Sequence, residues 1–148
     1  MITIKRGDLL EAEEKIIGHQ VNCFGAAGGL AAAVFEKWPR AGKIYSHFAK
    51  DNERYQHLGT TMIIKEKDEK RIANIYGQYY PGDDYRPEEL ELALCQLAVF
   101  AKQNNYSVAL PYKISCGICG GDWNEVKQII EETMDGVDCV IYQREGDE

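Results

Sequence analysis

The sequence has no long apolar run, and its 148 residues contain no uninterrupted stretch near the roughly 20 that a membrane-spanning helix needs. Its opening residues, MITIKRGDLL, lack the apolar core of a signal peptide. These absences predict a cytoplasmic protein with no membrane partner. Hydrophobic residues make up 45% and charged residues 28%, which is typical of a globular chain. The length fits one domain, spanning residues 1–148.

The sequence also lacks an excess of basic residues. Lysine and arginine number 17 against 24 aspartates and glutamates, so the formal net charge is −7. A nucleic-acid partner is therefore not expected, because binding its backbone requires a basic face. A small anionic ligand is not excluded, since backbone N–H groups can supply positive potential locally.

Cysteines are few and odd in number. Five at irregular spacing predict reduced thiols rather than a disulfide framework. Cys116 and Cys119 form a C-x-x-C, which leaves a thiol oxidoreductase open as an alternative function. No second Cys/His pair at zinc spacing follows, so we expect neither a metal site nor a bound cofactor. Cys23 and Cys139 are interpreted as small buried side chains.

Strand and helix patterns alternate along the chain. Apolar runs and alternation predict strands at 2–5, 15–21, 60–65, 71–76, 107–110 and 139–142. Helix formers and helical spacing predict helices at 30–38, 40–54, 87–103 and 123–134. The strands at 60–65 and 71–76 form a hairpin, and the tail from about residue 143 is expected to fray. The pattern predicts an α/β fold with a mixed, largely parallel sheet and helices on both faces.

Two glycine-rich loops each join a strand to a helix. The first contains Gly28 and Gly29, and the second contains Gly117, Gly120 and Gly121. Glycines let the backbone approach a ligand closely, and the following helix directs free N–H groups at the same space. Side by side, the loops could hold a diphosphate without a lysine. Either loop alone is also consistent with a tight turn, and neither matches the P-loop or the dinucleotide fingerprint.

The loops become more specific evidence when they are taken together with the motifs around them. Gly7-Asp8, then IIGHQVN with a Gly-Gly helix start, then ALPYKISCGICGGDW together resemble the macro-domain family over nearly the whole chain. The resemblance is to the branch containing the fungal ADP-ribose-1″-phosphate phosphatase and the terminal ADP-ribose glycohydrolase, which also has phage and bacterial members. It implies a three-layer α/β/α macro-type fold that binds ADP-ribose or a derivative, and we expect a monomer.

The resemblance also implies roles for particular residues. Asp8 stands where macro domains contact the adenine amino group, with the Leu9 N–H beside it, and Asn22 stands where they contact the distal ribose. The diphosphate would then lie between two segments of loop: Ala27, Gly28 and Gly29 in the first, and Ser115, Cys116, Gly117, Ile118, Cys119 and Gly120 in the second.

Catalytic residues are harder to assign. The lysine that the glycohydrolase uses for attack should fall in IYGQYY, which contains none, and Cys119 stands near that branch's catalytic aspartate. Asn22 and His19 are then the candidate catalytic residues, His19 because its ordinary pKa lies near neutrality. Strand alternation, however, directs His19 to the face opposite Asn22. Asp83 and Asp84 could activate water if their loop folds over the site.

Three functions remain open. The first is binding of ADP-ribose with hydrolysis of a 1″-linked phosphate or ADP-ribosyl group. The second is a non-catalytic reader of ADP-ribosylated proteins, and the third is the thiol oxidoreductase. The tyrosines around residues 76–85 could stack on a purine or ribose, or only pack their loop.

Overall fold

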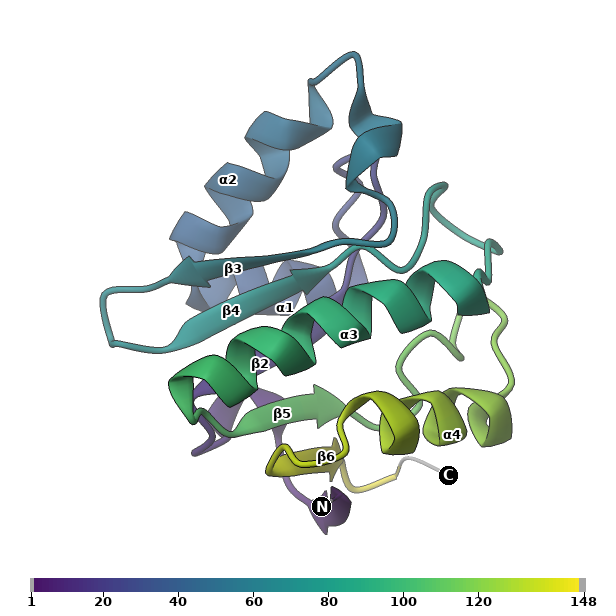
Figure 1. Cartoon of the computed structure of the whole chain (residues 1–148). Helices are drawn as coiled ribbons and strands as arrows, with labels where there is room; N and C mark the ends of the chain where they lie inside the picture. Colours follow the sequence, from purple (N-terminus) through teal and green to yellow (C-terminus); the bar gives the residue numbers. More distant parts are fainter. Residues whose placement is uncertain (1, 147–148) are drawn as a thin grey trace.

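The computed structural model describes residues 2–146, and its centre is a six-stranded sheet (Figure 1). The strands are β1 (Ile2–Arg6), β2 (Ile16–Gln20), β3 (Thr61–Lys65), β4 (Arg71–Ile75), β5 (Val108–Pro111) and β6 (Cys139–Gln143). Their order is β1-β6-β5-β2-β4-β3, with parallel pairing throughout except between β3 and β4. The predicted mixed, largely parallel sheet and its one hairpin are confirmed.

Helices cover both faces of this sheet. The helices α3 (Pro87–Asn104) and α4 (Trp123–Thr133) lie on one face, and α1 (Gly29–Lys37) and α2 (Pro39–Ala49) lie on the other (Figure 1). Each side has its own core. Leu90, Leu94 and Leu97 of α3 are fully buried at helical spacing, and Val34 and Trp38 are buried on the α1 side. The predicted three-layer α/β/α architecture is therefore confirmed.

The helix predicted over residues 40–54 is too long. In the structure α2 ends at Ala49, because the next residues form turns in which the Glu53 N–H donates to the Asp51 carboxylate. Two short 3₁₀ helices, η1 (Leu9–Glu11) and η2 (Arg54–His57), were not predicted. Such one-turn elements carry too few residues to show a hydrophobic period. Asp122 is the N-cap of α4, since its carboxylate accepts from the Asn124 N–H.

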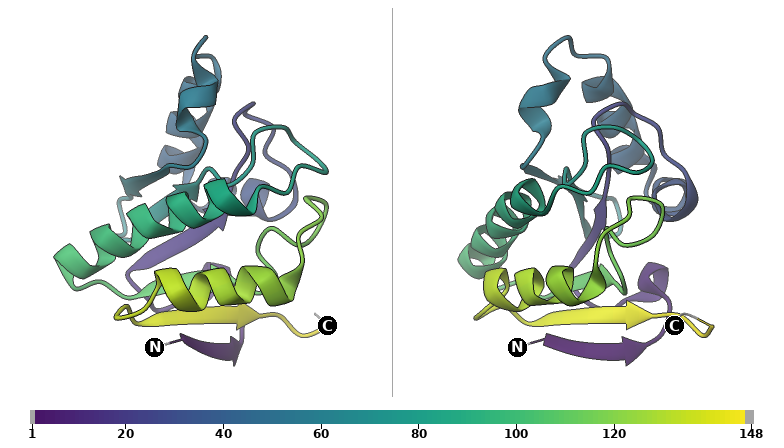
Figure 2. Two further views of the ribbon diagram at one scale, coloured as in Figure 1. Left: turned by 45° about the vertical axis from the view of Figure 1, so that its right-hand side comes forward. Right: turned by 90° about the vertical axis from the view of Figure 1, so that its right-hand side faces the viewer.

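The strand order fixes which loops meet at one edge. The five parallel strands end side by side, so the segments after β1, β6, β5, β2 and β4 follow one another in that order. The antiparallel β3 begins at the same edge, which brings η2 there too. In the right panel of Figure 2 the loops after β4 and β5 lie toward the viewer, and β1 and β6 end toward the right-hand edge of the picture. This edge is where ligands bind on open α/β sheets. No helix within residues 2–146 is long and apolar enough to cross a bilayer.

Candidate ligand site at the carboxyl edge of the sheet

A cavity of about 710 Å³ lies at this edge, over the ends of β1, β6 and β5. Segments far apart in the sequence form its wall, and the lining residues are Asp8, Leu9, Leu10, Gly29, Leu30, Ala33, Pro111, Tyr112, Lys113, Tyr142, Arg144 and Gly146. The wall thus joins the segment after β1 to the start of α1 and to the first residues of the β5–α4 loop. Its volume falls within the usual range for small-molecule sites.

Asp8 caps η1 and also lines the cavity. Its Oδ1 accepts the Leu10 N–H at 3.0 Å, while the side chain stays exposed and the following Leu9 is buried. A carboxylate that accepts one backbone hydrogen bond has lone pairs left for a ligand. The cap and the ligand contact are therefore compatible at this position.

The first loop (residues 21–28) is organised by Asn22. The Asn22 Nδ2 donates to the Ala26 carbonyl at 2.9 Å, and Oδ1 accepts the N–H groups of Phe24 and Ala26. The Tyr45 hydroxyl also lies 2.9 Å from Oδ1 and from the Asn22 carbonyl. The Asn22 side chain is 7% exposed, so its amide is used within the protein. Asn22 holds this loop on α2.

The glycines of the first loop serve two purposes. Gly25 has φ +77°, and a Cβ there would lie 2.6 Å from the Ala49 Cβ, so close packing against α2 requires glycine. Gly28 and Gly29 differ, because no atom would lie within 4 Å of a Cβ at either position. The space above them is open and adjoins the cavity that Gly29 lines.

The second loop (residues 112–122) takes its shape from its backbone. Lys113 and Ser115 have positive φ angles of 58° and 69°, and Gly120 has 90°. Backbone hydrogen bonds from Cys116 to Lys113, from Gly120 to Gly117 and from Gly121 to Ser115 close the turns. Cys119 is buried, whereas Ile118 is 85% exposed at the tip. A Cβ on Gly117 would also meet open space.

The β4–α3 loop (residues 76–86) folds against the second loop. Asp84 Oδ2 accepts the N–H groups of Tyr79 and Tyr80 and the Nε–H of Arg86, all at 2.8–2.9 Å. Burial acts to raise the pKa of Asp84, but the hydrogen bonds from Arg86 and the two tyrosine amides outweigh it and lower that pKa. Asp84 is therefore an ionised residue that holds its own loop together.

Asp83 is placed differently from its neighbour. A Cβ added at Gly120 would lie 2.5 Å from Asp83 Oδ1, so this carboxylate rests directly on the second loop. Asp83 is exposed, and no hydrogen bond or ion pair within residues 2–146 engages its oxygens. The β4–α3 loop thus rests on the second loop, with the Asp84 carboxylate bonded within its own loop and the Asp83 carboxylate free.

His19 lies in the core on the α1–α2 side of the sheet. Its Nε2 is 2.7 Å from Asn74 Oδ1, and its ring meets Phe35 of α1 edge-on at 5.1 Å. Burial lowers the pKa of His19 to about 4, although the hydrogen bond to Asn74 acts in the opposite direction. The imidazole is neutral at physiological pH. Gln20 points to the other face, toward Gln78, as the alternation predicts. Asn22, beyond the end of β2, does not follow it: its side chain contacts Tyr45 of α2, on the same side of the sheet as His19.

Neither thiol chemistry nor a metal centre has support at this edge. Burial, with a smaller effect from Asp122, raises the pKa of Cys116 to about 11. A depressed pKa favours thiol reactivity, so the raised pKa of Cys116 gives the thiol oxidoreductase alternative no support. All five cysteines are free, and Cys23 and Cys139 are buried as expected. Over the described part of the chain, no three His, Cys, Asp or Glu side chains are grouped to hold a metal ion.

Several cavity residues were not identified from the sequence. Four of them line the cavity without having been given a role: Tyr112 and Lys113 stand inside the ALPYKISCGICGGDW segment, and Tyr142 and Arg144 belong to no motif. Their signal is positional, because each lies at or just after the carboxyl end of β5 or β6. Arg144 and Gly146 belong to the tail that was expected to fray, whereas residues 147–148 lie outside the described part of the chain.

This geometry agrees with comparisons to known proteins. Residues 19–130 match the model of the family described as Macro domain. The chain belongs to the macro domain family. A curated relative is the ADP-ribose 1″-phosphate phosphatase of Lodderomyces elongisporus, 30% identical over 95% of this macro domain and 98% of that protein.

Bacterial relatives agree with this assignment. The DNA ADP-ribosyl glycohydrolase of Mycobacterium tuberculosis is 28% identical over 99% of this macro domain, which spans only 43% of that protein. Among solved structures, the macrodomain of Mycobacterium tuberculosis DarG has a TM-score of 0.83 and 26% identity. The match covers 96% of this chain and 97% of the DarG macrodomain chain.

Proposed function

We propose that this macro domain binds ADP-ribose carrying a group on its 1″ carbon and hydrolyses the bond at that carbon. The observation that carries the proposal is the open space above Gly28, Gly29 and Gly117, together with the cavity that Gly29 and Asp8 both line. The diphosphate would lie over these glycines, where loop N–H groups and the start of α1 supply positive potential. The adenine would lie near Asp8 and Leu9, and the distal ribose near Asn22.

Hydrolysis at the 1″ carbon is supported by the relatives. The fungal relative is named for removing a 1″-phosphate, and the mycobacterial relative for removing ADP-ribosyl groups from DNA. A glycohydrolase cleaves a glycosidic bond, which in an ADP-ribosyl group is the bond at C1″. The fungal name gives the 1″ position of the phosphate that is removed, so the supporting feature is that shared position, and the group removed differs between the two relatives.

Asp83 is the residue that we assign to the chemistry. The second loop has Cys119 near the position where related glycohydrolases carry an aspartate, and the Asp83 carboxylate rests on the adjoining Gly120. As general base, Asp83 would take a proton from water while the water oxygen bonds to C1″. The bond from C1″ to the leaving group breaks, and loop N–H groups stabilise the charge that develops.

Two measurements test the proposal. Calorimetric titration should show saturable ADP-ribose binding, and no heat at high micromolar ligand would overturn it. Asp83→Asn should reduce turnover of ADP-ribose-1″-phosphate by about 100-fold, the low end of general-base effects, with ADP-ribose affinity kept within threefold. The control Asp135→Asn changes an exposed carboxylate just after α4 and should leave turnover unchanged. Full activity in Asp83→Asn would remove Asp83 from the mechanism.

One observation favours a second function, a non-catalytic reader. The amide of Asn22 is occupied within the protein and His19 is buried, so neither residue first considered for catalysis is free to act on a ligand. A reader would bind ADP-ribose but release no phosphate or ADP-ribose on long incubation with any 1″-linked substrate. Product formation by the wild type that depends on Asp83 excludes it.

A further inference from the structure

Exposed aromatic side chains gather at the β4 end of the carboxyl edge. Phe24 comes from the first loop, Tyr79 and Tyr80 from the β4–α3 loop, and Tyr55 from η2; we call these four residues the aromatic platform. Tyr79 is central, with ring centroids 5.0 Å from Phe24, 5.2 Å from Tyr55 and 4.7 Å from Tyr80. The loops that carry it are joined by a backbone hydrogen bond from Cys23 to Tyr79.

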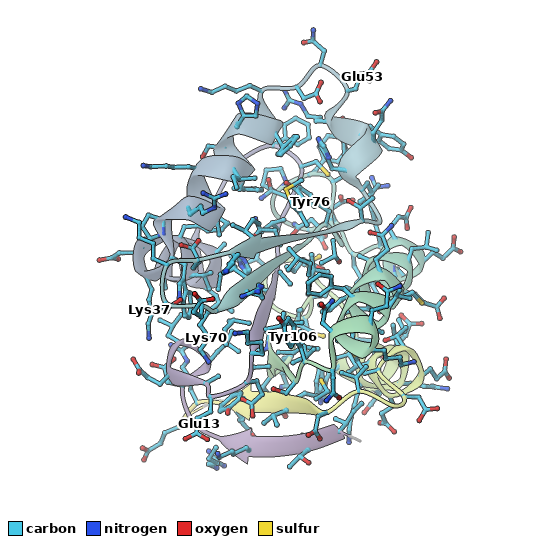
Figure 3. The ribbon with its side chains drawn as sticks, turned by 60° about the vertical axis from the view of Figure 1, so that its left-hand side comes forward. Glu13, Lys37, Glu53, Lys70, Tyr76 and Tyr106 are labelled. Atoms are coloured by element: carbon cyan, nitrogen blue, oxygen red, sulfur yellow. The ribbon has the colours of Figure 1, made fainter. Side chains whose placement is uncertain are left out.

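Three of the four platform side chains are exposed, and Tyr79 is half-buried among them. Tyr55 is 60% exposed, Tyr80 53% and Phe24 36%. The nearby Tyr76, by contrast, is buried inside the molecule. Glu53, just before η2, lies at the top of the view in Figure 3. Clusters of exposed aromatic rings mark binding surfaces more often than single exposed residues do.

Two arginines border these rings. The Arg54 guanidinium lies 4.5 Å from the Phe24 centroid and Arg86 5.7 Å from that of Tyr79. Arg86 is paired with Asp84, whereas Arg54 has no carboxylate partner within residues 2–146. Aromatic faces beside an unpaired guanidinium provide stacking for a flat ring and a charge for one adjacent phosphate.

The strand order places the platform beyond the distal ribose. Asp8 follows β1 at one end of the row, the glycine loops follow β5 and β2 in the middle, and Tyr79 follows β4 at the other end. An ADP-ribose lying along this row with its adenine at Asp8 would direct its 1″ carbon toward the platform. What is attached to that carbon would then meet the aromatic rings.

We propose that the platform is a subsite for a single nucleotide, with its base stacked on Tyr80 and Tyr55 and its phosphate at Arg54. The inference rests on the proposed function for the direction of the 1″ carbon. The net charge of −7 argues against tight binding of a long strand through its phosphates, so the subsite is proposed for one nucleotide. Stacking therefore dominates its affinity, and sequence preference is weak.

The test is titration of the full chain with a 5′-phosphorylated thymidine trinucleotide, with binding measured by tyrosine fluorescence or NMR. A parallel titration uses ADP-ribose. Tyr55→Ala/Tyr80→Ala should weaken trinucleotide binding at least tenfold and leave ADP-ribose affinity within twofold. An abasic trinucleotide should bind as weakly to the wild type as the intact one does to the variant. Raising NaCl from 50 to 300 mM should weaken binding only about threefold, as expected for one phosphate.

The matched control is Leu92→Ala, which removes a side chain that is also 60% exposed, but on α3. It should change neither affinity. Equal trinucleotide binding by wild type and platform variant would overturn the proposal, and so would equal binding of a tryptophan-containing tripeptide, which would make the platform a peptide site. If the wild type did not bind ADP-ribose, the proposed function would fail instead, so the two failures are distinguishable.

Discussion

The two glycine loops reach the same edge of the sheet, but different kinds of interaction hold them. In the first loop one side chain, Asn22, accepts or donates four hydrogen bonds and ties the loop to Tyr45 of α2. The second loop uses no such residue and relies on turns with positive φ at Lys113, Ser115 and Gly120. Asn22, a candidate catalytic residue in the sequence, is therefore structural, and the second loop is held mainly by its backbone turns, with Ile118 exposed at its tip.

Replacement of Asn22 should have the largest effect on stability, because this residue is the side-chain anchor that distinguishes the first loop from the second. Asn22→Ala removes hydrogen bonds to two loop amides and one carbonyl, and it leaves the buried Tyr45 hydroxyl with one acceptor fewer. We expect a loss of about 2–3 kcal/mol of unfolding free energy, measured by urea denaturation. ADP-ribose affinity should fall as well, because the loop loses its shape.

The matched control is Asn124→Ala, an exposed asparagine in the first turn of α4. Its stability should stay within about 0.5 kcal/mol of the wild type. If Asn22→Ala kept full stability yet lost turnover at saturating substrate, Asn22 would be catalytic rather than structural.

Replacement of Gly28 should separate binding from stability. Gly28 has φ −127°, which any residue can adopt, and a Cβ there meets open space in the free protein. Gly28→Ala should therefore fold with unchanged stability but weaken ADP-ribose at least tenfold, about 1.4 kcal/mol, by occupying the space above the loop. Thermal melting and calorimetry on one preparation check both. Unchanged affinity would place the diphosphate elsewhere.

The sequence predicted the layers and the loops well because both depend on local patterns. Helical spacing in α3, alternation in β4 and glycines between strand and helix are all visible in short windows. The platform and the cavity wall were not visible, because Tyr55, Tyr79 and Phe24 meet only once the strand order is known. Similarly, Asp83 and Asp84 are equivalent in sequence, and only the fold makes one a loop anchor and leaves the other free.

The net charge illustrates what composition can and cannot decide. A value of −7 argues against holding a long nucleic-acid strand by its phosphates. It does not bear on one base stacked on exposed rings, which needs aromatic faces rather than a basic surface. The same reasoning allows an acidic chain to hold a diphosphate with backbone N–H groups.

The smallest effect is expected at the tip of the second loop. Ile118 is 85% exposed and stands beside Gly117, above which space is open. Because its side chain contacts little in the free protein, Ile118→Ala should change unfolding free energy by less than about 0.5 kcal/mol. A ligand held over Gly117 would bury part of that side chain, so ADP-ribose affinity should fall about threefold, within the range of one partly buried aliphatic group. Calorimetry beside urea denaturation measures both quantities. A large loss of stability would show that the tip is packed rather than open, and would remove the contrast with the loop that Asn22 anchors.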